Sequence, residues 1–218
     1  MATVPHEMDR QIRLVCFDLG GVVVRICRSW QEGCIAAGLD VRHTDDSPHR
    51  AHERFELTRQ HQTGVIDCDT YAQRMSELLD GAYSPKEVRA IHDAWMFGEY
   101  EGIASLIERI NQTGVETAAL SNTSHSHWQR LLHFPSIQRM THRAASHLLG
   151  RFKPDPAIYA AFEAQVSRLP HEILFFDDLA ENIEAAQRLG WIGVQIDHNR
   201  CTASQIHASL IKHRVLCD

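Results

Sequence analysis

The chain has 218 residues, enough for one sizeable domain or for one domain with a small insertion. Its 44% hydrophobic and 23% charged residues are typical of an ordinary globular protein. The net charge of -6, with no run of Lys or Arg, argues against a nucleic-acid partner, which would require a basic stripe.

Cysteine usage and the lack of long apolar segments bear on where the protein works. The six cysteines include no Cys-x-x-Cys pair, which excludes the spacing of a zinc ribbon. Residues 1–11 are polar and lack the apolar stretch of a signal peptide. No apolar run approaches the roughly 20 residues that span a bilayer. We therefore expect a cytoplasmic protein with reduced thiols and no membrane partner.

The first predicted element is a strand over residues 13–17, whose continuous apolar character indicates burial on both faces, as in a parallel sheet. Residues 26–101 differ, because they are polar and place apolar residues at helical spacing. Breaks at Gly64 and at Asp80-Gly81 divide this segment, which we interpret as a helical insertion. The apolar residues with this spacing are Phe55, Leu57, Tyr71, Met75, Leu78 and Leu79.

Helices and strands alternate after residue 102. Strands are predicted over 115–120, 140–145, 173–176 and 192–196, and helices over 103–111, from 156 with Asp155 as N-cap, over 180–189 closed by Gly190, and over 204–213. This alternation implies right-handed crossovers and a doubly wound parallel α/β sheet. The predicted domains are a core of residues 1–25 and 102–218 and a helical insertion of residues 26–101.

Polar side chains stand where the predicted strands end. Asp18 follows the first strand, Ser121-Asn122 follows the second, and Asp177-Asp178 follows the fourth. Lys153 lies in the loop before the helix that begins at Pro156. Because ligands bind beyond the carboxyl ends of parallel strands, we expect these groups to face one crevice.

The chemistry of these groups suits a phosphoryl group. Three carboxylates, from Asp18, Asp177 and Asp178, would repel one another across a small site unless a cation offsets them. Mg²⁺ prefers oxygen ligands and completes its coordination with water and substrate phosphate. Lys153 adds a positive charge and Ser121 a hydroxyl donor. Phosphoryl transfer depends mainly on positioning and charge neutralisation, and an Asp nucleophile is a known covalent strategy.

Four short motifs resemble those of the haloacid dehalogenase-like hydrolases, and they occur in the same order. The matching segments are Phe17-Asp18-Leu19-Gly20-Gly21-Val22, Leu120-Ser121-Asn122, Lys153-Pro154-Asp155-Pro156-Ala157-Ile158-Tyr159, and Phe176-Asp177-Asp178 with Asn182 and Ala185-Ala186. The resemblance spans nearly the whole chain and implies a Rossmann-like core.

The resemblance also implies roles for these residues. Asp18 would be the nucleophile, and Mg²⁺ would be held by Asp18, the backbone carbonyl of Gly20 and Asp178. Asp177 would act through water or hydrogen bonds. The substrate would be bound by Ser121, Asn122 and Lys153, and Asn182 would orient Asp178 or Lys153.

The resemblance assigns the insertion as well. Residues 26–101 match the family's small α-helical cap, which closes over the site and selects substrate. Gly20-Gly21 and Trp95 are similar to a subgroup that includes bacterial sugar-phosphate phosphatases and the N-terminal phosphatase domain of soluble epoxide hydrolase.

One position departs from the family pattern. Family phosphatases usually carry a second Asp two residues after the nucleophile, which protonates the leaving group and later activates water. Gly20 stands at that position here, and Val22 stands where Thr is usual. The carbonyl of Gly20 can still bind metal, but the acid/base function is lost, which is typically worth about 10²–10⁴-fold in rate.

The sequence therefore favours a Mg²⁺-dependent phosphatase of a small phosphorylated metabolite, with sugar phosphates among the candidates, acting through an aspartyl-phosphate on Asp18. One alternative is a metal-independent 2-haloacid dehalogenase, against which the Asp177-Asp178 pair argues. The other is a catalytically silent binding or regulatory protein with the same fold, which the loss at Gly20 motivates. The sequence predicts no oligomeric state.

Several residues have a structural interpretation beside the functional one. For Lys153 the structural interpretation is a solvated loop residue, and for Ser121 it is an N-cap of the next helix. His125 and His127 stand two apart, on different faces of a helix, and we interpret them as a solvated helix start rather than a metal site. Arg54, Arg59, His61 and Tyr71 could reach a substrate, although such residues are usually solvated, and His207 and His213 are expected at the surface.

Overall fold

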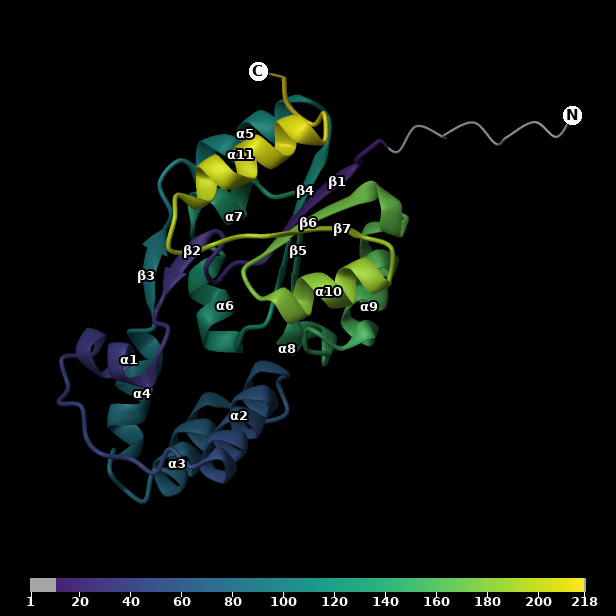
Figure 1. Ribbon diagram of the computed structural model, residues 1–218. Coiled ribbons are helices and arrows are strands. Elements are labelled where there is room, and N and C mark those ends of the chain that lie inside the picture. The colour runs from purple at the N-terminus through teal and green to yellow at the C-terminus, as the bar shows by residue number, and fades with distance from the viewer. Residues whose placement is uncertain (1–10, 218) are drawn as a thin grey trace, which may run out of the picture.

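The computed structural model describes residues 11–217 (Figure 1). The expectation that residues 1–11 are no signal peptide therefore falls almost wholly outside the described part of the chain. Within residues 11–217, no helix is both long enough and apolar enough to cross a membrane.

A five-stranded parallel sheet forms the centre of the molecule. Its strand order is β5-β4-β1-β6-β7, and every neighbouring pair is parallel. The strands are β1 (Leu14–Phe17), β4 (Glu116–Ser121), β5 (His142–Ala145), β6 (Ile173–Asp177) and β7 (Ile192–Gln195). The order runs outward from β1 in both directions, as expected for a doubly wound sheet. The predicted fold class is confirmed, with strand ends shifted by one or two residues.

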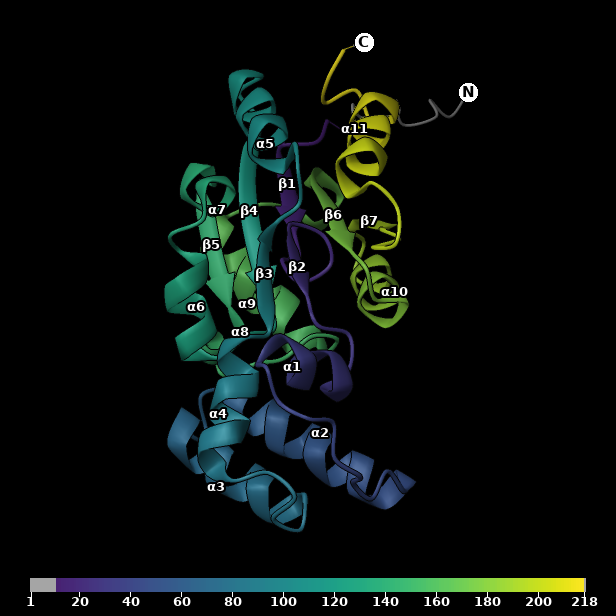
Figure 2. The same ribbon diagram turned by 90° about the vertical axis from the view of Figure 1, so that its left-hand side faces the viewer.

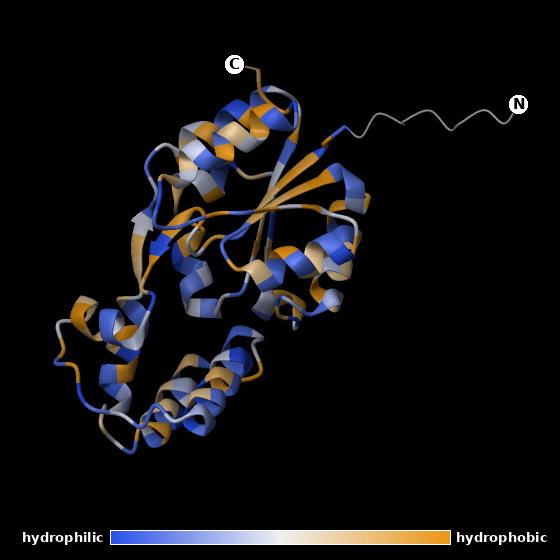
Figure 3. Cartoon of the chain, viewed as in Figure 1, coloured by the Kyte–Doolittle hydropathy of each residue, from blue (hydrophilic) through white to orange (hydrophobic). Residues whose placement is uncertain are grey.

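Helices cover both faces of this sheet. Along β1, Val15 and Phe17 belong to one apolar cluster and Leu14 and Cys16 to the other, so the strand is buried on both faces as predicted. The first cluster includes α5 (Ile103–Gln112), α6 (His125–Leu131), α7 (Pro135–Arg139) and α11 (Thr202–Lys212). The second includes α9 (Pro156–Val166) and α10 (Ala180–Arg188), with α8 (Ser146–Leu149) and the 3-10 helix η1 (Pro170–Glu172) in the connections. Figure 3 shows the central strands largely hydrophobic and the helices mixed.

Local signals at the helix ends have the predicted effect. The Asp155 side chain accepts a hydrogen bond from the backbone N–H of Ala157, and Pro156 is the first residue of α9. Gly190 follows α10 with a φ of +93°, a conformation that glycine adopts without strain. These two residues fix where α9 begins and where α10 ends, and so where the loops at the sheet edge lie.

The segment between residues 30 and 93, here called the helical insert, consists of α1 (Trp30–Ala36), α2 (Pro48–Gln62), α3 (Cys68–Leu78) and α4 (Pro85–Asp93). It has an apolar cluster of its own, separate from the two that flank the sheet. That cluster contains Cys34, Leu57, Tyr71, Ala72, Met75, Leu79, Tyr83, Val88 and Ile91. The insert therefore packs as a unit beside the carboxyl edge of the sheet (Figures 1 and 2).

A two-stranded antiparallel ribbon carries the chain into and out of the insert. β2 (Val24–Ile26) pairs with β3 (Met96–Glu99), and Figure 2 shows the ribbon between sheet and insert. The sequence interpretation gave residues 96–99 to the helical insertion, which is wrong for this strand. Its four residues are too few to show a period of two, and their partner lies some seventy positions earlier in the chain.

Candidate active site

Strand register brings the predicted acidic residues to one edge of the sheet. Phe17 of β1 is level with Ala119 of β4 and with Phe176 of β6. Asp18 therefore lies between the ends of β4 and β6, beside Asp177. This is where the strand order turns back on itself, which is the usual position of a ligand site in an open α/β sheet.

Lys153 connects two of these carboxylates. Its Nζ donates to Asp18 Oδ1 at 2.8 Å and to Asp177 Oδ2 at 2.7 Å, and the residue is only 1% exposed. Burial alone would lower the pKa of the ammonium, but Asp177 and Asp18 raise that pKa overall, so the group stays charged. The interpretation of Lys153 as a solvated loop residue is wrong.

Asp18, Asp177 and Asp178 form a compact cluster. One ligand oxygen from each lies within 4.8 Å of the other two, and all three residues are buried. Burial raises the pKa of Asp18 to about 7, Lys153 opposes this rise, and Asp177 and Asp178 add to it. Three carboxylates around one lysine leave an excess of negative charge, which is a favourable place for a cation.

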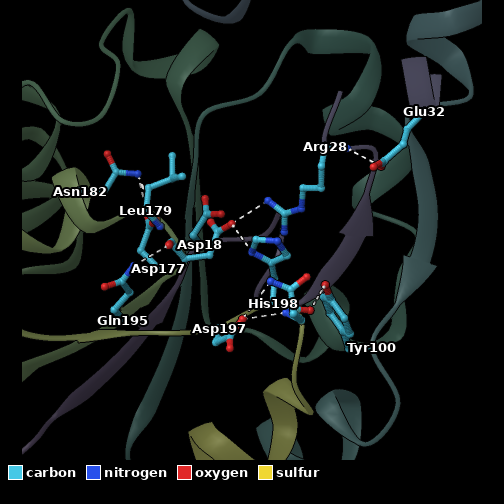
Figure 4. A network of polar contacts seen from close by, with 12 residues as sticks. Asp18, Arg28, Glu32, Tyr100, Asp177, Leu179, Asn182, Gln195, Asp197 and His198 are labelled. Carbon is cyan, nitrogen blue, oxygen red and sulfur yellow. Dashed lines mark hydrogen bonds and ion pairs between the residues drawn. The ribbon is translucent and has the colours of Figure 1, made fainter. Parts of the chain in front are cut away.

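Asp178 has two further partners that the sequence interpretation did not include. Arg28, between β2 and α1, places Nη1 2.7 Å from Asp178 Oδ2, and His198 Nδ1 lies 3.6 Å from the same oxygen. Figure 4 shows both side chains directed toward the carboxylates. No motif or spacing distinguishes Arg28 from the other arginines of its polar segment, so nothing in the sequence points to this contact.

Two asparagines position this cluster. Asn182 Nδ2 donates to both carboxylate oxygens of Asp177, at 3.1 and 3.0 Å. Asn182 thus orients Asp177, not Asp178 or Lys153 as the sequence suggested. The sequence analysis assigned Asn122 to substrate binding. In the structure, its side-chain Nδ2 donates to the Lys153 carbonyl and its Oδ1 accepts from the Lys153 N–H, each at 2.9 Å. We infer that Asn122 positions Lys153.

The glycine pair after Asp18 allows close approach of the backbone. Gly21 has a φ of +86°, and a Cβ there would lie 2.5 Å from Asp178 Oδ2. Only glycine leaves this space free, so the loop backbone lies against the carboxylate. Backbone and carboxylate oxygens are the ligands that Mg²⁺ takes in proteins, and this donor set therefore fits the ion.

Ser121 lies at the end of β4, and α6 with its two histidines follows it in the chain. Ser124, not Ser121, caps α6, which removes the N-cap interpretation of Ser121. His125 is exposed, but His127 is buried and stacks on His92 of α4 with ring centroids 3.7 Å apart. The expected solvated helix start is thus wrong for His127, because α4 of the insert covers that face of α6.

Two other residues of the insert are buried. His61 and Tyr71 stack on each other with ring centroids 4.3 Å apart, whereas Arg59 is exposed and pairs with Glu56.

The expected surface residues His207 and His213 are half-buried.

A cavity of about 340 Å³ lies between the helical insert and the sheet edge. Its wall includes Leu19, Gly20, Ser121 and Asn122, next to the carboxylate cluster, and side chains from all four helices of the insert. A molecule bound in this cavity would thus reach the neighbourhood of Asp18.

Comparison with solved structures shows the same fold in known enzymes. A HAD family enzyme from Bacteroides thetaiotaomicron matches with a TM-score of 0.74 at 19% identity, covering 90% of this chain and 98% of that one. Its complex with magnesium and inorganic phosphate matches with a TM-score of 0.70 at 21% identity, covering 87% and 96%. The L-2-haloacid dehalogenase of Xanthobacter autotrophicus matches with a TM-score of 0.61 at 18% identity, covering 91% and 83%.

Sequence comparison gives a relative and a family. Acyl-CoA dehydrogenase family member 10 of Mus musculus is 25% identical over an alignment of 217 positions that covers 94% of this chain. The chain spans only about a fifth (20%) of that relative's length. The family model for haloacid dehalogenase-like hydrolases matches residues 12–190. With the motifs, the sheet and the site in agreement, the chain belongs to the haloacid dehalogenase-like hydrolases.

Proposed function

We propose that this hydrolase is a Mg²⁺-dependent phosphatase that removes phosphate from a small phosphorylated metabolite. The observation that carries the proposal is the buried Lys153, which holds Asp18 and Asp177 while a third carboxylate, Asp178, lies within ligand distance of both. Such a site combines a nucleophile with a surplus of negative charge that a divalent cation would offset. The six free cysteines support a reducing compartment, and we propose a cytoplasmic location.

In this proposal Mg²⁺ would be held by Asp18, the Gly20 carbonyl and Asp178. The ion would neutralise phosphoryl oxygens and so favour transfer. A carboxylate oxygen of Asp18 attacks phosphorus, and the bond from phosphorus to the alcohol oxygen breaks. Lys153 holds the carboxylate in place, and the Ser121 hydroxyl donates to a phosphoryl oxygen. Water then attacks phosphorus, which releases phosphate and restores the Asp18 carboxylate.

The departing alkoxide needs a proton, and Gly20 offers no side chain to supply it. Water reaching the cavity, an acid of the helical insert or an acid on the substrate would have to fill this role. We therefore expect turnover to favour esters of the more acidic alcohols, since these leave without protonation.

The arrangement of Arg28 favours one alternative. By pairing with Asp178, Arg28 offsets part of the negative charge without a metal, as a metal-independent 2-haloacid dehalogenase would require. However, Lys153 and Arg28 supply two positive charges against three carboxylates. The remaining negative charge would repel a carboxylate substrate and a departing halide, so we retain the phosphatase as the main proposal.

The test is phosphate release from a panel of phosphate monoesters, with Mg²⁺ and with EDTA, for the native chain and for Asp18→Asn. The amide is nearly the same size as the carboxylate but poorly nucleophilic, so we expect the variant to fold and to release no phosphate. Asp197→Asn is the matched control. Asp197 lies after β7, the strand next to β6 in the sheet, and is not part of the carboxylate cluster.

The outcomes separate the candidates. Release that requires both metal and Asp18 supports the phosphatase. Halide release from 2-haloacids in EDTA supports the dehalogenase. A folded protein that does neither would point to a binding or regulatory role. Phosphate release that persists in Asp18→Asn would contradict the aspartyl-phosphate mechanism.

A further inference from the structure

The cavity beside the carboxylate cluster has a predominantly apolar wall. On the side of the sheet, Leu19, Val24 and Ile26 line it. The insert contributes aromatic and aliphatic side chains from four helices and the turn after α4: Trp30, Phe55, Tyr71, Met75, Leu79, Ile91 and Trp95. Most of these belong to the insert's own apolar cluster or pack against it, so the cavity opens directly onto that cluster.

Several polar groups of the wall are engaged with the protein, whereas the buried Trp30 Nε1 has no hydrogen-bond partner among the described residues. Arg54 pairs with Asp46 at 2.9 Å and also donates to the Asp45 carbonyl at 2.6 Å. The Thr58 hydroxyl donates to the Arg54 carbonyl at 2.9 Å. These groups would have to break existing bonds to serve a ligand.

Two of the three imidazoles of the wall are similarly occupied, whereas His92 Nδ1 has no hydrogen-bond partner among the described residues. His127 Nε2 bonds the His92 carbonyl at 2.7 Å, and His61 Nε2 lies 3.2 Å from Cys68 Sγ. Burial lowers the pKa of both His61 and His127 to about 3, so neither ring brings a positive charge to the cavity at neutral pH. The Asn122 amide is bonded to Lys153, as described above.

A sugar would fit such a wall poorly. Each hydroxyl that leaves water without gaining a hydrogen bond opposes binding, and a hexose carries several. An alkyl or aryl group, by contrast, gains from the apolar wall with every methylene that it buries. The volume, about 340 Å³, is at the lower end of the range for small-molecule sites.

Resting on the proposed phosphatase activity, we propose that the natural substrate is a phosphate monoester of an apolar alcohol, alkyl or aryl, rather than of a sugar. The phosphoryl group would lie at Asp18 and the apolar portion in the cavity under the insert. In this arrangement the side chains of the insert, rather than those of the sheet edge, determine which substrate is chosen.

The test compares hexyl phosphate with glucose 6-phosphate. Both are primary monoesters of six-carbon alcohols and differ in their hydroxyl groups. Hexanol is the less acidic of the two alcohols and so the poorer leaving group. We expect the apolar wall to outweigh this, so that kcat/KM favours hexyl phosphate by at least about tenfold and rises roughly fourfold per methylene from propyl to hexyl phosphate, esters whose alcohols have similar acidity. Binding of the same two esters to Asp18→Asn, measured by calorimetry with Mg²⁺ present, should show the same preference without turnover.

Phe55→Asn tests the wall itself. Phe55 lines the cavity at its border with the core, where its ring meets that of Phe152 edge-on, and it is 53% exposed, so its replacement should not disturb the insert's packing. We expect the preference for hexyl phosphate to fall by roughly three- to tenfold. Phe97→Asn is the matched control, because Phe97 is also 53% exposed and does not line the cavity.

The two readouts keep this inference apart from the phosphatase proposal. If Asp18→Asn prefers hexyl phosphate but the native chain hydrolyses neither ester, the apolar site stands and the phosphatase proposal fails. If phosphate is released but glucose 6-phosphate is bound and hydrolysed at least as well, the apolar inference is overturned and the phosphatase stands. Equal loss of preference in Phe55→Asn and Phe97→Asn would also overturn it.

Discussion

Lys153 is a charge buried between two opposite charges, and its removal leaves both carboxylates without that positive charge. We predict that Lys153→Met lowers the free energy of unfolding by roughly 3–5 kcal/mol, the usual consequence of breaking a buried ion pair on one side. Urea unfolding followed by circular dichroism measures the change. The exposed Lys86→Met is the control and should change stability by less than about 0.5 kcal/mol. A stability loss no larger than in this control would contradict the assigned role.

Arg28 and a divalent cation would compete for the same oxygen of Asp178. Arg28→Gln removes a positive charge 2.7 Å from Asp178 Oδ2, so we expect it to strengthen Mg²⁺ binding by roughly three- to tenfold. Isothermal calorimetry of Mg²⁺ on the substrate-free protein gives the affinity. Arg25→Gln, an exposed arginine of β2, should leave that affinity unchanged. Weaker Mg²⁺ binding in Arg28→Gln would instead show that Arg28 supports the metal site.

At the scale of elements, β2 packs against the loop that follows Asp18. A Cβ on Gly20 would lie 2.8 Å from Cδ1 of Ile26, the flexible end of that side chain. We predict that Ile26 Cδ1 must shift for Gly20→Asp to fit, and that Gly20→Asp with Ile26→Val, which removes Cδ1, raises phosphate release by roughly tenfold or more by supplying the missing acid. Ile26→Val alone is the control. A flat rate in the double variant would mean that another group already delivers the proton.

The elements that carry the predicted site are those whose signals are local. β1, β4 and β6 are short apolar runs followed by polar residues, and parallel strands bring Asp18, Ser121 and Asp177 to one edge without further information. The position of Lys153 close to these carboxylates was predicted from the family motif that begins at this residue.

The features that could not be predicted from the sequence depend on contacts between segments that are far apart in the chain. Arg28 meets Asp178 across 150 positions, β3 pairs with β2 across the insert, and the burial of His127 arises because α4 lies on α6. Such contacts leave no periodic pattern in the sequence of either partner. The apolar cavity was missed for the same reason, because its wall combines residues from the insert and the core.

At the scale of the whole molecule, histidines buried between the insert and the core link stability to pH. His127 has a pKa of about 3 in the folded protein, against about 6.5 when unfolded. Between these values the unfolded chain binds more protons, so the contribution of His127 to stability is complete above about pH 6.5 and is lost as the pH falls toward 3.

The comparison of variants isolates this effect, because the raised pKa of Asp18 acts in the opposite direction. We expect the native chain to lose roughly 1–2 kcal/mol more than His127→Gln between pH 7 and pH 5, as measured by urea unfolding. His125→Gln, on the exposed face of α6, should follow the native chain. Identical pH dependence in all three proteins would contradict the prediction.

The β2–β3 ribbon has a consequence for how the molecule can change. Val24 and Glu99 are paired, so the long stretch between them leaves and re-enters the core at adjacent points, like an enlarged hairpin loop. The entropy of closing a loop grows only slowly with its length, so the length of the segment between the two strands has little effect on the stability of the core. Replacing residues 30–93 by a different insert, with Arg28 retained, should therefore exchange the cavity wall that the insert provides while leaving Arg28 and the carboxylate cluster in place.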